Sequence, residues 1–339
     1  MKAPQRILLA HGAGGRLTRE LVERLFLPAF ANPELEDLDD AALLPELPPG
    51  RPALTTDGHV VDPPVFAGGD LGTLSVNGTV NDLVMAGARP LWLTWAVILE
   101  EGLDGELLAT CVEGARRAAE EAGVRIAAGD TKTVPRGKGD RIFAVTAGLG
   151  VVPPGRGVND RNIAPGDAIL VTGTVGDHGA TIMAHRHGME STELVSDCAA
   201  LNGLLEPLWE AGVPIHALHD PTRGGVATTC NEAAARSGLR FVLDQQALPV
   251  APPVRAVCEL LGLDPFYLAC EGRALVWLPE AEADRALEIL RGHPLGRGSA
   301  RIGEVVDSAP GHAPVEVRTV SGALRPLDLL SGMDLPRIC

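Results

Sequence analysis

The sequence has few aromatic residues, little positive charge and no long apolar run, and each shortage narrows its possible functions. Aromatic residues make up 3% of the 339 residues, which leaves few rings for stacking on nucleic-acid bases. The net charge of −15 also argues against nucleic acids and anionic membranes as partners, since both favour basic surfaces. The apolar run at residues 7–10 is too short for a signal peptide, and no stretch approaches a membrane span. We therefore expect a cytoplasmic protein, long enough for two domains.

The cysteines show no CxxC pair and no histidine at metal-ligand spacing. Zinc and iron–sulfur sites are therefore not expected, nor is a disulfide framework in a chain of this size. Five of the six are expected to be small core residues: Cys111, Cys198, Cys230, Cys258 and Cys270.

The sixth cysteine, Cys339, is the last residue of the chain. Residues 331–339 form a predicted flexible tail with a glycine, Gly332, near its start, and extended they could reach roughly 30 Å. A terminal thiol can carry a bound group from one place to another, and Arg337 can offset the effect of the terminal carboxylate on its pKa. Ile338 offers an apolar anchor for docking. The alternative is a frayed end that happens to finish in cysteine.

Common nucleotide-binding signatures are also missing. No GxxxxGK[ST] sequence occurs, and the glycines at 12–15 do not have the spacing of a dinucleotide-binding turn. Any nucleotide must therefore bind through a different structural motif.

Hydrophobic periodicity predicts strands and helices in an α+β arrangement. The first half has expected helices at 71–86 and 106–122 and expected strands at 54–57, 91–99, 124–128 and 142–152. A Pro- and Gly-rich stretch at 153–157 is the best linker. Beyond it we expect a strand at 168–172 and helices at 201–211 and from about 225 to 238. The predicted domains are residues 1–153 and 154–330, followed by the tail.

Acidic residues recur beside glycine, threonine or asparagine at the expected ends of strands. Magnesium favours a few carboxylates together with nucleotide phosphates, and such dispersed residues suit it. Glycine turns at 176–179 and 223–225 could offer backbone N–H groups to phosphate. The same residue types also form ordinary turns and caps. The clusters are Asp37–Ala42, Thr56–Gly58, Asn77 with Asn81 and Asp82, the expected turn Gly129–Lys132, and Asp220–Thr222.

Lys132 and Glu271 are two further candidates. Only three of the 29 basic residues are lysines, and Lys132 directly follows Gly129–Thr131, where a compact charge suits proton transfer or a phosphate oxygen. Lys138, between two glycines, has the pattern of an exposed loop. Glu271, before a glycine, has by itself the pattern of a surface turn residue.

Taken together, these segments resemble the HypE family of hydrogenase maturation factors, within the PurM-like superfamily of AIR synthetase, thiamine-monophosphate kinase, selenophosphate synthetase and FGAM synthetase. The terminal Pro-Arg-Ile-Cys narrows the resemblance from the superfamily to this family. The matching segments are His11–Gly15, Asp39–Ala42, Thr55–Asp57, His59–Val61, Gly68–Asp70, Val76–Leu83, Gly129–Lys132, Gly176–Gly179, Asp220–Gly225, Glu271–Gly272 and Pro336–Cys339.

The resemblance implies a reaction, a fold and partners. Cys339 would receive a carbamoyl group from the carbamoyltransferase HypF, and ATP would drive its dehydration to a thiocyanate. The cyano group would pass, through the HypC–HypD scaffold complex, to the iron of a [NiFe] hydrogenase. The fold would have an N-terminal domain whose sheet joins its copy in a homodimer as a shared barrel, and a C-terminal α/β sandwich domain.

The resemblance also assigns residues to roles. Catalysis falls to Cys339, Lys132 and Glu271. The expected ATP contacts are Asp39, Asp57, Asn81, Asp82, Gly129, Asp130, Thr131 and Lys132. The expected Mg²⁺ ligands are Asp40, Asp82, Asp130 and Asp220.

Two alternatives remain at this point. A superfamily kinase or synthetase would act on a free small molecule, although selenophosphate synthetase would need a reactive cysteine near the N-terminal glycines, and the first cysteine is Cys111. A non-enzymatic scaffold would need no ATP. The sequence also departs from the family pattern at Gly58, Cys270 and Arg273, where serine, asparagine and lysine are usual.

Overall fold

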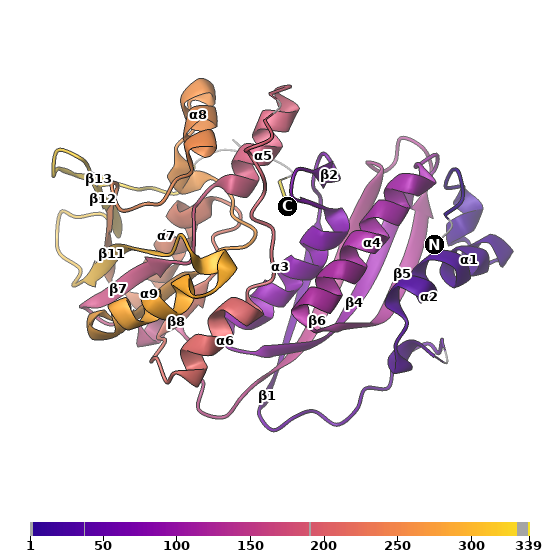
Figure 1. Cartoon of the computed structure of the whole chain (residues 1–339), viewed down its shortest axis with the longest axis horizontal. Coiled ribbons are helices and arrows are strands. Elements are labelled where there is room, and N and C mark those ends of the chain that lie inside the picture. The colour runs from indigo at the N-terminus through magenta and orange to yellow at the C-terminus, as the bar shows by residue number, and fades with distance from the viewer. Residues whose placement is uncertain (1–2, 37, 190, 331–337) are drawn as a thin grey trace. The chain divides into compact units, whose positions relative to one another are not determined.

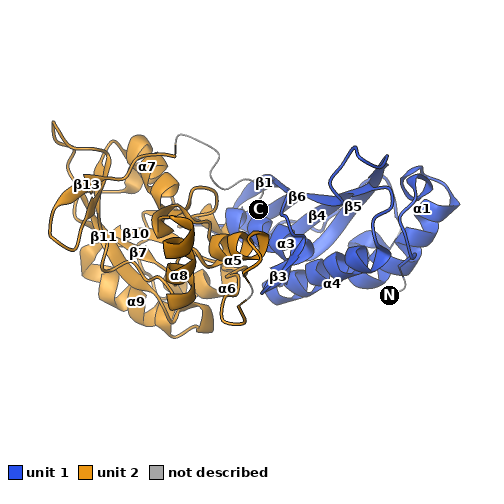
Figure 2. Ribbon diagram, turned by 90° about the horizontal axis from the view of Figure 1, so that it is seen from above, with its two compact units in different colours: residues 1–83, 88–154, 339 blue, residues 84–87, 155–338 orange. Residues whose placement is uncertain are grey.

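The computed structural model of the chain describes residues 3–36, 38–189, 191–330 and 338–339. It divides into two compact units, residues 1–83, 88–154 and 339 in the first and residues 84–87 and 155–338 in the second (Figures 1 and 2). Of the predicted tail, only Ile338 and Cys339 belong to the described residues, so Gly332 and Arg337 lie outside them.

The first unit is built on a four-stranded sheet in the order β1-β6-β4-β5. β1 and β4 pair antiparallel with β6, whereas β5 lies parallel to β4 because a helix, α4, returns the chain between them. The elements of this unit are β1 (Arg51–His59), β2 (Val65–Phe66), β3 (Gly69–Asp70), α3 (Leu71–Met85), β4 (Arg89–Glu100), α4 (Gly105–Ala122), β5 (Arg125–Val134) and β6 (Ile142–Val152).

Helices α3 and α4 lie along one face of this sheet (Figure 1). Along β1 the side chains alternate, so that Thr55, Asp57 and His59 are more buried than their neighbours. This is the period of two that a strand imposes. α3 is buried almost all round, which agrees with its apolar and small residues. α4 is amphipathic and ends at Gly123, whose φ of +68° suits glycine. The strand pattern therefore aims three polar side chains of β1 at the helices.

A layer formed by the N-terminal residues packs against β5. It consists of η1 (Leu9–Gly12), α1 (Arg16–Leu21), η2 (Val22–Phe26), α2 (Leu27–Phe30) and η3 (Pro33–Leu35). The Thr133 hydroxyl donates to the Leu9 carbonyl at 2.7 Å, and the Asn32 amide donates to the Ile126 carbonyl at 2.9 Å. These two bonds tie both ends of the layer to β5.

The second unit is built on a mixed seven-stranded sheet in the order β13-β12-β9-β11-β7-β10-β8. All five residues of β7 are buried, and Trp277 in the adjacent β10 has no exposed surface. The strands are β7 (Asp167–Val171), β8 (Ala217–His219), β9 (Arg240–Asp244), β10 (Leu275–Pro279), β11 (Ala300–Val306), β12 (Val315–Arg318) and β13 (Leu324–Pro326). The helices are α5 (Asp177–Arg186), α6 (Asn202–Glu210), α7 (Gly225–Ser237), α8 (Pro252–Leu261) and α9 (Ala283–Arg291), with the short turns η4 (Asp160–Asn162), η5 (Pro265–Tyr267), η6 (Glu280–Glu282) and η7 (Pro294–Gly296).

Most of the predicted elements are confirmed, but the turn at 129–132 is wrong. These residues lie inside β5, where Gly129 pairs with Trp95 and Lys132 pairs with Ile98. Pairing with the long, buried β4 extends the strand past the point where Gly129 and Asp130 suggest a break. The consequence is that Asp130 and Lys132 lie two residues apart on a strand, and therefore on one face of it.

The glycine turns before α5 and α7 also differ from expectation. Gly176 and Gly224 precede these helices in the left-handed conformation. However, the Gly176 N–H donates to the Cys270 sulfur, the Gly179 N–H to the Ala269 carbonyl and the Gly225 N–H to the Thr222 carbonyl. These N–H groups hold the fold together and are not open to phosphate.

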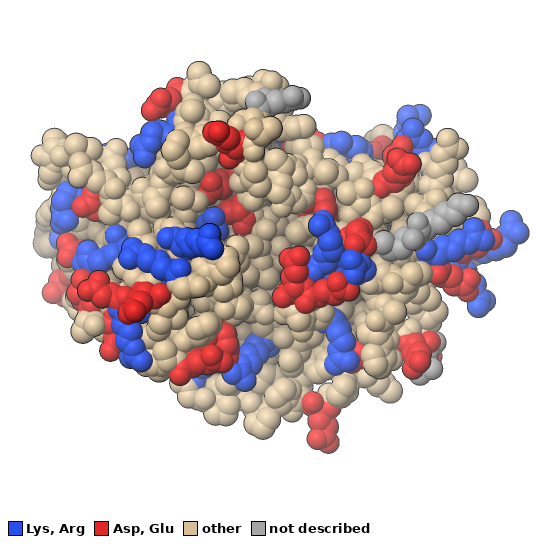
Figure 3. Space-filling model, in the orientation of Figure 1, with Lys and Arg blue, Asp and Glu red and all other residues tan. Residues whose placement is uncertain are grey.

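The surface carries both signs of charge. On the face shown in Figure 3, acidic and basic side chains are interspersed. Among the helices of the described residues, none is long and apolar enough to cross a membrane.

Candidate active site

Asp57 and Asp82 form a carboxylate pair between β1 and α3. The Thr55 hydroxyl donates to Asp82 at 2.8 Å, and His59 Nε2 lies 3.6 Å from Asp57 Oδ2. Burial raises the pKa of Asp82, the Thr55 bond opposes this, and the negative charge of Asp57 adds to the rise. Two carboxylates that repel each other in a half-buried position form a site that a cation would stabilise. The adjacent Asn81 is 1% exposed.

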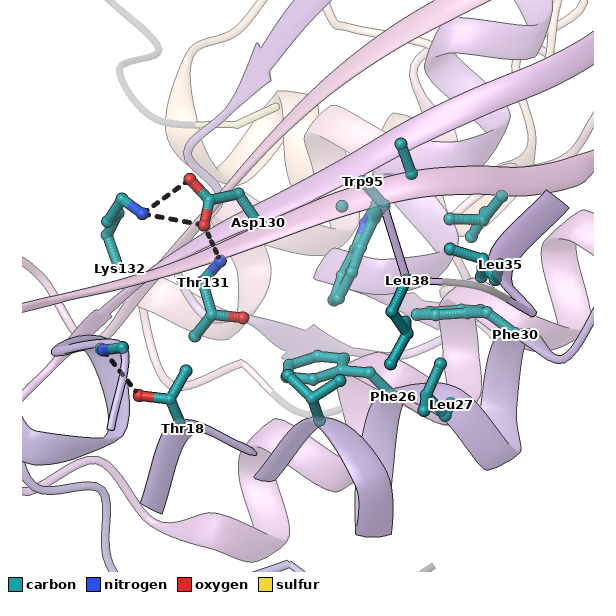
Figure 4. A pocket seen from close by; sticks show the side chains of 16 residues that line it. Thr18, Phe26, Leu27, Phe30, Leu35, Leu38, Trp95, Asp130, Thr131 and Lys132 are labelled. Carbon is teal, nitrogen blue, oxygen red and sulfur yellow. Dashed lines mark hydrogen bonds and ion pairs between the residues drawn. The ribbon is translucent and has the colours of Figure 1, made fainter. Parts of the chain in front are cut away.

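Asp130 and Lys132 project from β5 and pair with each other. The Lys132 ammonium lies 2.9 Å from both carboxylate oxygens of Asp130, and the Thr131 N–H donates to Asp130 at 2.7 Å (Figure 4). The Lys132 bond is the main reason that the pKa of Asp130 is lowered. Both side chains are more than half exposed. Because the Lys132 ammonium is exposed and paired with a carboxylate, it is better suited to contact a phosphate oxygen than to act as a base.

A cavity of about 250 Å³ lies between the N-terminal layer and the sheet of the first unit. At one end lie Phe26, Phe30 and Trp95, with Phe30 edge-on to Trp95 at a ring distance of 5.6 Å (Figure 4). Asp130, Thr131 and Lys132 line its polar edge, together with Gly12, Gly14 and Thr18 of the N-terminal layer. An aromatic end beside a polar, glycine-bearing edge fits a flat ring that carries a charged group.

The aromatic end of this cavity was not predicted. The signal was present, because Val22, Phe26 and Phe30 follow one another at four-residue intervals and so share a helix face. Such a stripe is more often part of a core. The sequence could predict that this stripe lines a cavity only if it also predicted that the N-terminal layer packs against β5.

The predicted magnesium ligands Asp40, Asp82, Asp130 and Asp220 come from separate segments of the chain. Asp39 and Asp40 lie exposed in an irregular segment that follows η3. Asp220 lies after β8 in the second unit. Across the part of the chain that the structure describes, no three His, Cys, Asp or Glu side chains are placed to hold a metal ion. Asp57 and Asp82 form an acidic pair in the first unit, so a magnesium site there would need oxygen atoms from the phosphates to complete it.

Glu271 is buried, in contrast to the surface position that its local sequence suggests. The residue is 4% exposed, and its N–H donates to Asp197 Oδ1 at 3.1 Å. Asp197 is itself buried, which raises its pKa, and its other carboxylate oxygen lies 3.7 Å from the Arg273 guanidinium. Arg273 also donates to the Thr174 carbonyl at 2.8 Å. Arg273 donates to the Gly272 carbonyl at 2.9 Å as well, so its planar guanidinium joins the turns at 174 and 272, whereas a lysine would have a single nitrogen for both.

Cys270 is an inert core thiol. It has no exposed surface and accepts the Gly176 N–H at 3.1 Å, and burial raises its pKa well above the usual value. Burial also raises the pKa of Cys111 to about 12 and that of Cys258 to about 11. Cys198 and Cys339 are the partly exposed cysteines of the described residues.

The chain end is bound on both sides of its last peptide bond. A C-terminal carboxylate oxygen of Cys339 accepts the Val60 N–H at 3.1 Å. Ile338 is 3% exposed, and its carbonyl lies 2.6 Å from His178 Nε2. The last two residues are therefore held by specific contacts.

Known proteins match this chain over nearly its whole length. Residues 38–152 match the AIR synthase related protein N-terminal domain, and residues 164–314 match the corresponding C-terminal domain. Carbamoyl dehydratase HypE of Cupriavidus necator is 49% identical over 335 residues, which are 98% of this chain and 95% of that protein. A crystal structure of the hydrogenase maturation protein HypE in complex with ATP has a TM-score of 0.94 at 46% identity, and covers 98% of this chain and 99% of its own. A crystal structure of a HypE–HypF complex has a TM-score of 0.79 at 43% identity, and the match covers 93% of this chain and 100% of that chain. The resemblance read from the motifs and the α+β fold are thus confirmed, and the chain belongs to the HypE family of carbamoyl dehydratases.

Proposed function

We propose that this chain uses ATP to dehydrate a carbamoyl group carried on its own Cys339 and so provides the cyano group for [NiFe] hydrogenase. The observation that carries the proposal is the bound chain end, because Ile338 is buried and held by its carbonyl while the next residue is the thiol. A kinase that acts on a free small molecule would not need a C-terminal cysteine whose neighbouring residue is held in place. The test is an ATP-dependent loss of one water from the carbamoyl adduct of the intact protein.

The reaction proceeds in two steps. Transfer of the γ-phosphoryl group of ATP to the carboxamide oxygen converts a poor leaving group into phosphate and releases ADP. Loss of phosphate and of the N–H protons then forms the C≡N bond and leaves a thiocyanate on the sulfur. We assign proton removal to Glu271, whose buried position keeps water away, and contact with the transferred phosphate to Lys132.

We assign the nucleotide base to the cavity of the first unit. Phe26, Phe30 and Trp95 offer ring faces and edges, and the triphosphate would extend along the polar edge toward Thr131 and Lys132. Asp39, Gly129 and Asn81 remain proposed contacts of the nucleotide. Bound magnesium would supply positive charge to the phosphates, and its proposed ligands are Asp40, Asp82, Asp130 and Asp220. Asp57, which repels Asp82, is a supporting residue.

Replacement of Phe30 should weaken ATP binding. Stacking of a base on a ring contributes about 1–3 kcal/mol, so Phe30→Ala is expected to raise the Kd for a non-hydrolysable ATP analogue by about tenfold or more. Leu260→Ala is the matched control, because Leu260 is 73% exposed in the second unit. Equilibrium binding measures both, and equal affinities of Phe30→Ala and wild type would place the base elsewhere.

The uncovered face of the first sheet supports a homodimer. Leu54 on β1 is 78% exposed and lies opposite Leu149 on β6, and Val145 on the same strand is 40% exposed. An apolar sheet face open to water is an unfavourable surface unless it is paired. We propose that two copies join here as a shared barrel. A monomer mass in sedimentation equilibrium would contradict this pairing.

The remaining proposals follow the family. We take HypF as the carbamoyl donor and the HypC–HypD complex as the acceptor of the cyano group, and place the reaction in the cytoplasm. Residues 1–153 are proposed as the ATP-binding and dimerisation domain, residues 154–330 as the second domain, and residues 331–339 as the tail that carries the thiol.

A further inference from the structure

His178 occupies a position that the reaction described above does not use. It is the second residue of α5, within the segment 176–179, and it has no exposed surface. Its two ring nitrogens each have a close partner, Nε2 the Ile338 carbonyl at 2.6 Å and Nδ1 the Ser196 hydroxyl at 2.8 Å. A buried histidine that contacts the penultimate carbonyl of the chain is well placed to act on the tail.

The partners of the ring fix its protonation. A carbonyl oxygen can only accept, so Nε2 carries the hydrogen, and in the neutral ring Nδ1 must then accept the Ser196 hydroxyl. The Ser196 oxygen in turn accepts the Cys198 N–H at 3.1 Å. Burial lowers the pKa of His178 to about 4, so the ring is neutral near pH 7. The chain of bonds therefore runs in one direction, from the Cys198 N–H to the Ile338 carbonyl.

The segment that supports His178 also supports Glu271. Ser196 holds the imidazole, while the next residue, Asp197, accepts the Glu271 N–H at 3.1 Å. Displacement of Ser196 and Asp197 would therefore disturb both the bond from His178 to Ile338 and the position of Glu271, the proposed base. One short stretch of chain thus couples the position of residue 338 to that of Glu271.

We propose that His178 is the positioning residue that docks the end of the chain: its neutral imidazole donates to the Ile338 carbonyl and fixes the peptide next to the reactive thiol. The proposal rests on the proposed function only in taking Cys339 as the carrier. A thiol loaded by a partner must be reachable, whereas elimination of phosphate needs a site that excludes water. The hydrogen bond from His178 stabilises the docked position of the chain end, in which the thiol can be kept away from water.

Digestion by a carboxypeptidase tests the docking without ATP or a carbamoyl donor. Release of Cys339 and Ile338 requires an undocked end, and intact mass measures its rate. In His178→Leu, which cannot donate a hydrogen bond, the rate is expected to rise about tenfold, the order of effect of one unmade buried hydrogen bond. His178→Gln keeps an N–H donor and should restore part of the protection. His185→Leu is the control, because His185 is exposed on the same helix.

A second variant keeps the proposal open to failure if His178→Leu does not fold. Ser196→Ala removes the donor to Nδ1, so the ring is no longer held in the required tautomer, and digestion should accelerate by a smaller factor. Dehydration of a preloaded adduct should slow in His178→Leu and recover in His178→Gln, while ATP affinity and carbamoylation stay at wild-type values. A merely structural defect would lower all three.

The outcomes separate the docking from the function. Digestion rates equal to wild type in the folded His178→Leu variant, or in Ser196→Ala where the first does not fold, would overturn the docking. A carbamoyl adduct found on another cysteine would contradict the proposed function, yet it would leave the digestion rates, and the docking that they measure, unchanged.

Discussion

Cys339→Ala is expected to bind ATP as tightly as the wild type and to acquire no carbamoyl adduct at all. The acceptor must be a thiolate that a partner can reach. Burial removes Cys111, Cys230, Cys258 and Cys270 from consideration, because each has a raised pKa and almost no exposed surface. Mass spectrometry after incubation with the carbamoyl donor system measures the loss.

Two groups of control variants sharpen this result. Cys270→Ala and Cys258→Ala should still acquire the adduct at Cys339. Cys198→Ala is the most demanding control, because Cys198 is the other partly exposed cysteine of the described residues. An adduct that maps to Cys198, or that persists in Cys339→Ala, would contradict the mechanism.

Glu271→Gln and Lys132→Ala should both become carbamoylated but stall before dehydration. A positioned acid or base typically contributes about 10²- to 10⁴-fold to a rate, and we expect Glu271→Gln to lose activity in this range. For Lys132→Ala the same loss is expected to come from a weaker contact with the phosphate, because the Lys132 side chain is 65% exposed and paired with Asp130. Single-turnover conversion of a preloaded adduct measures both variants.

Matched variants distinguish these roles from general damage. Lys138→Ala removes a lysine six positions along the chain in an exposed turn, and Glu280→Gln removes an exposed carboxylate of the second unit. Both should dehydrate the adduct at the wild-type rate. If Glu271→Gln or Lys132→Ala matched them, that residue would return to a purely structural role.

Sequence reasoning was most accurate where local pattern decides the structure. The helix at 106–122 follows from its apolar periodicity and from Gly123, and the structure has it at Gly105–Ala122. The strand at 142–152 follows from apolar composition and is confirmed as β6. The terminal cysteine and the segments that resemble the family were sufficient to identify it, because they combine over the whole chain.

It was less accurate where distant packing decides. Gly129 and Asp130 have the pattern of a turn, yet pairing with β4 holds them in a strand. Glu271 precedes a glycine as a surface turn residue would, yet its close contact with Asp197 buries it. The wall of the cavity depends on the packing of the N-terminal layer against β5, which no local pattern encodes.

The most direct test of the whole account is the intact mass of the wild-type protein after carbamoylation, measured before and after addition of Mg-ATP. The account predicts an adduct of one carbamoyl group at Cys339 that loses the mass of one water only when ATP is present, with one ADP formed for each water lost. The non-hydrolysable analogue should leave the carbamoyl mass unchanged. An adduct that loses water without ATP, or ADP formation that leaves the adduct intact, would contradict the account.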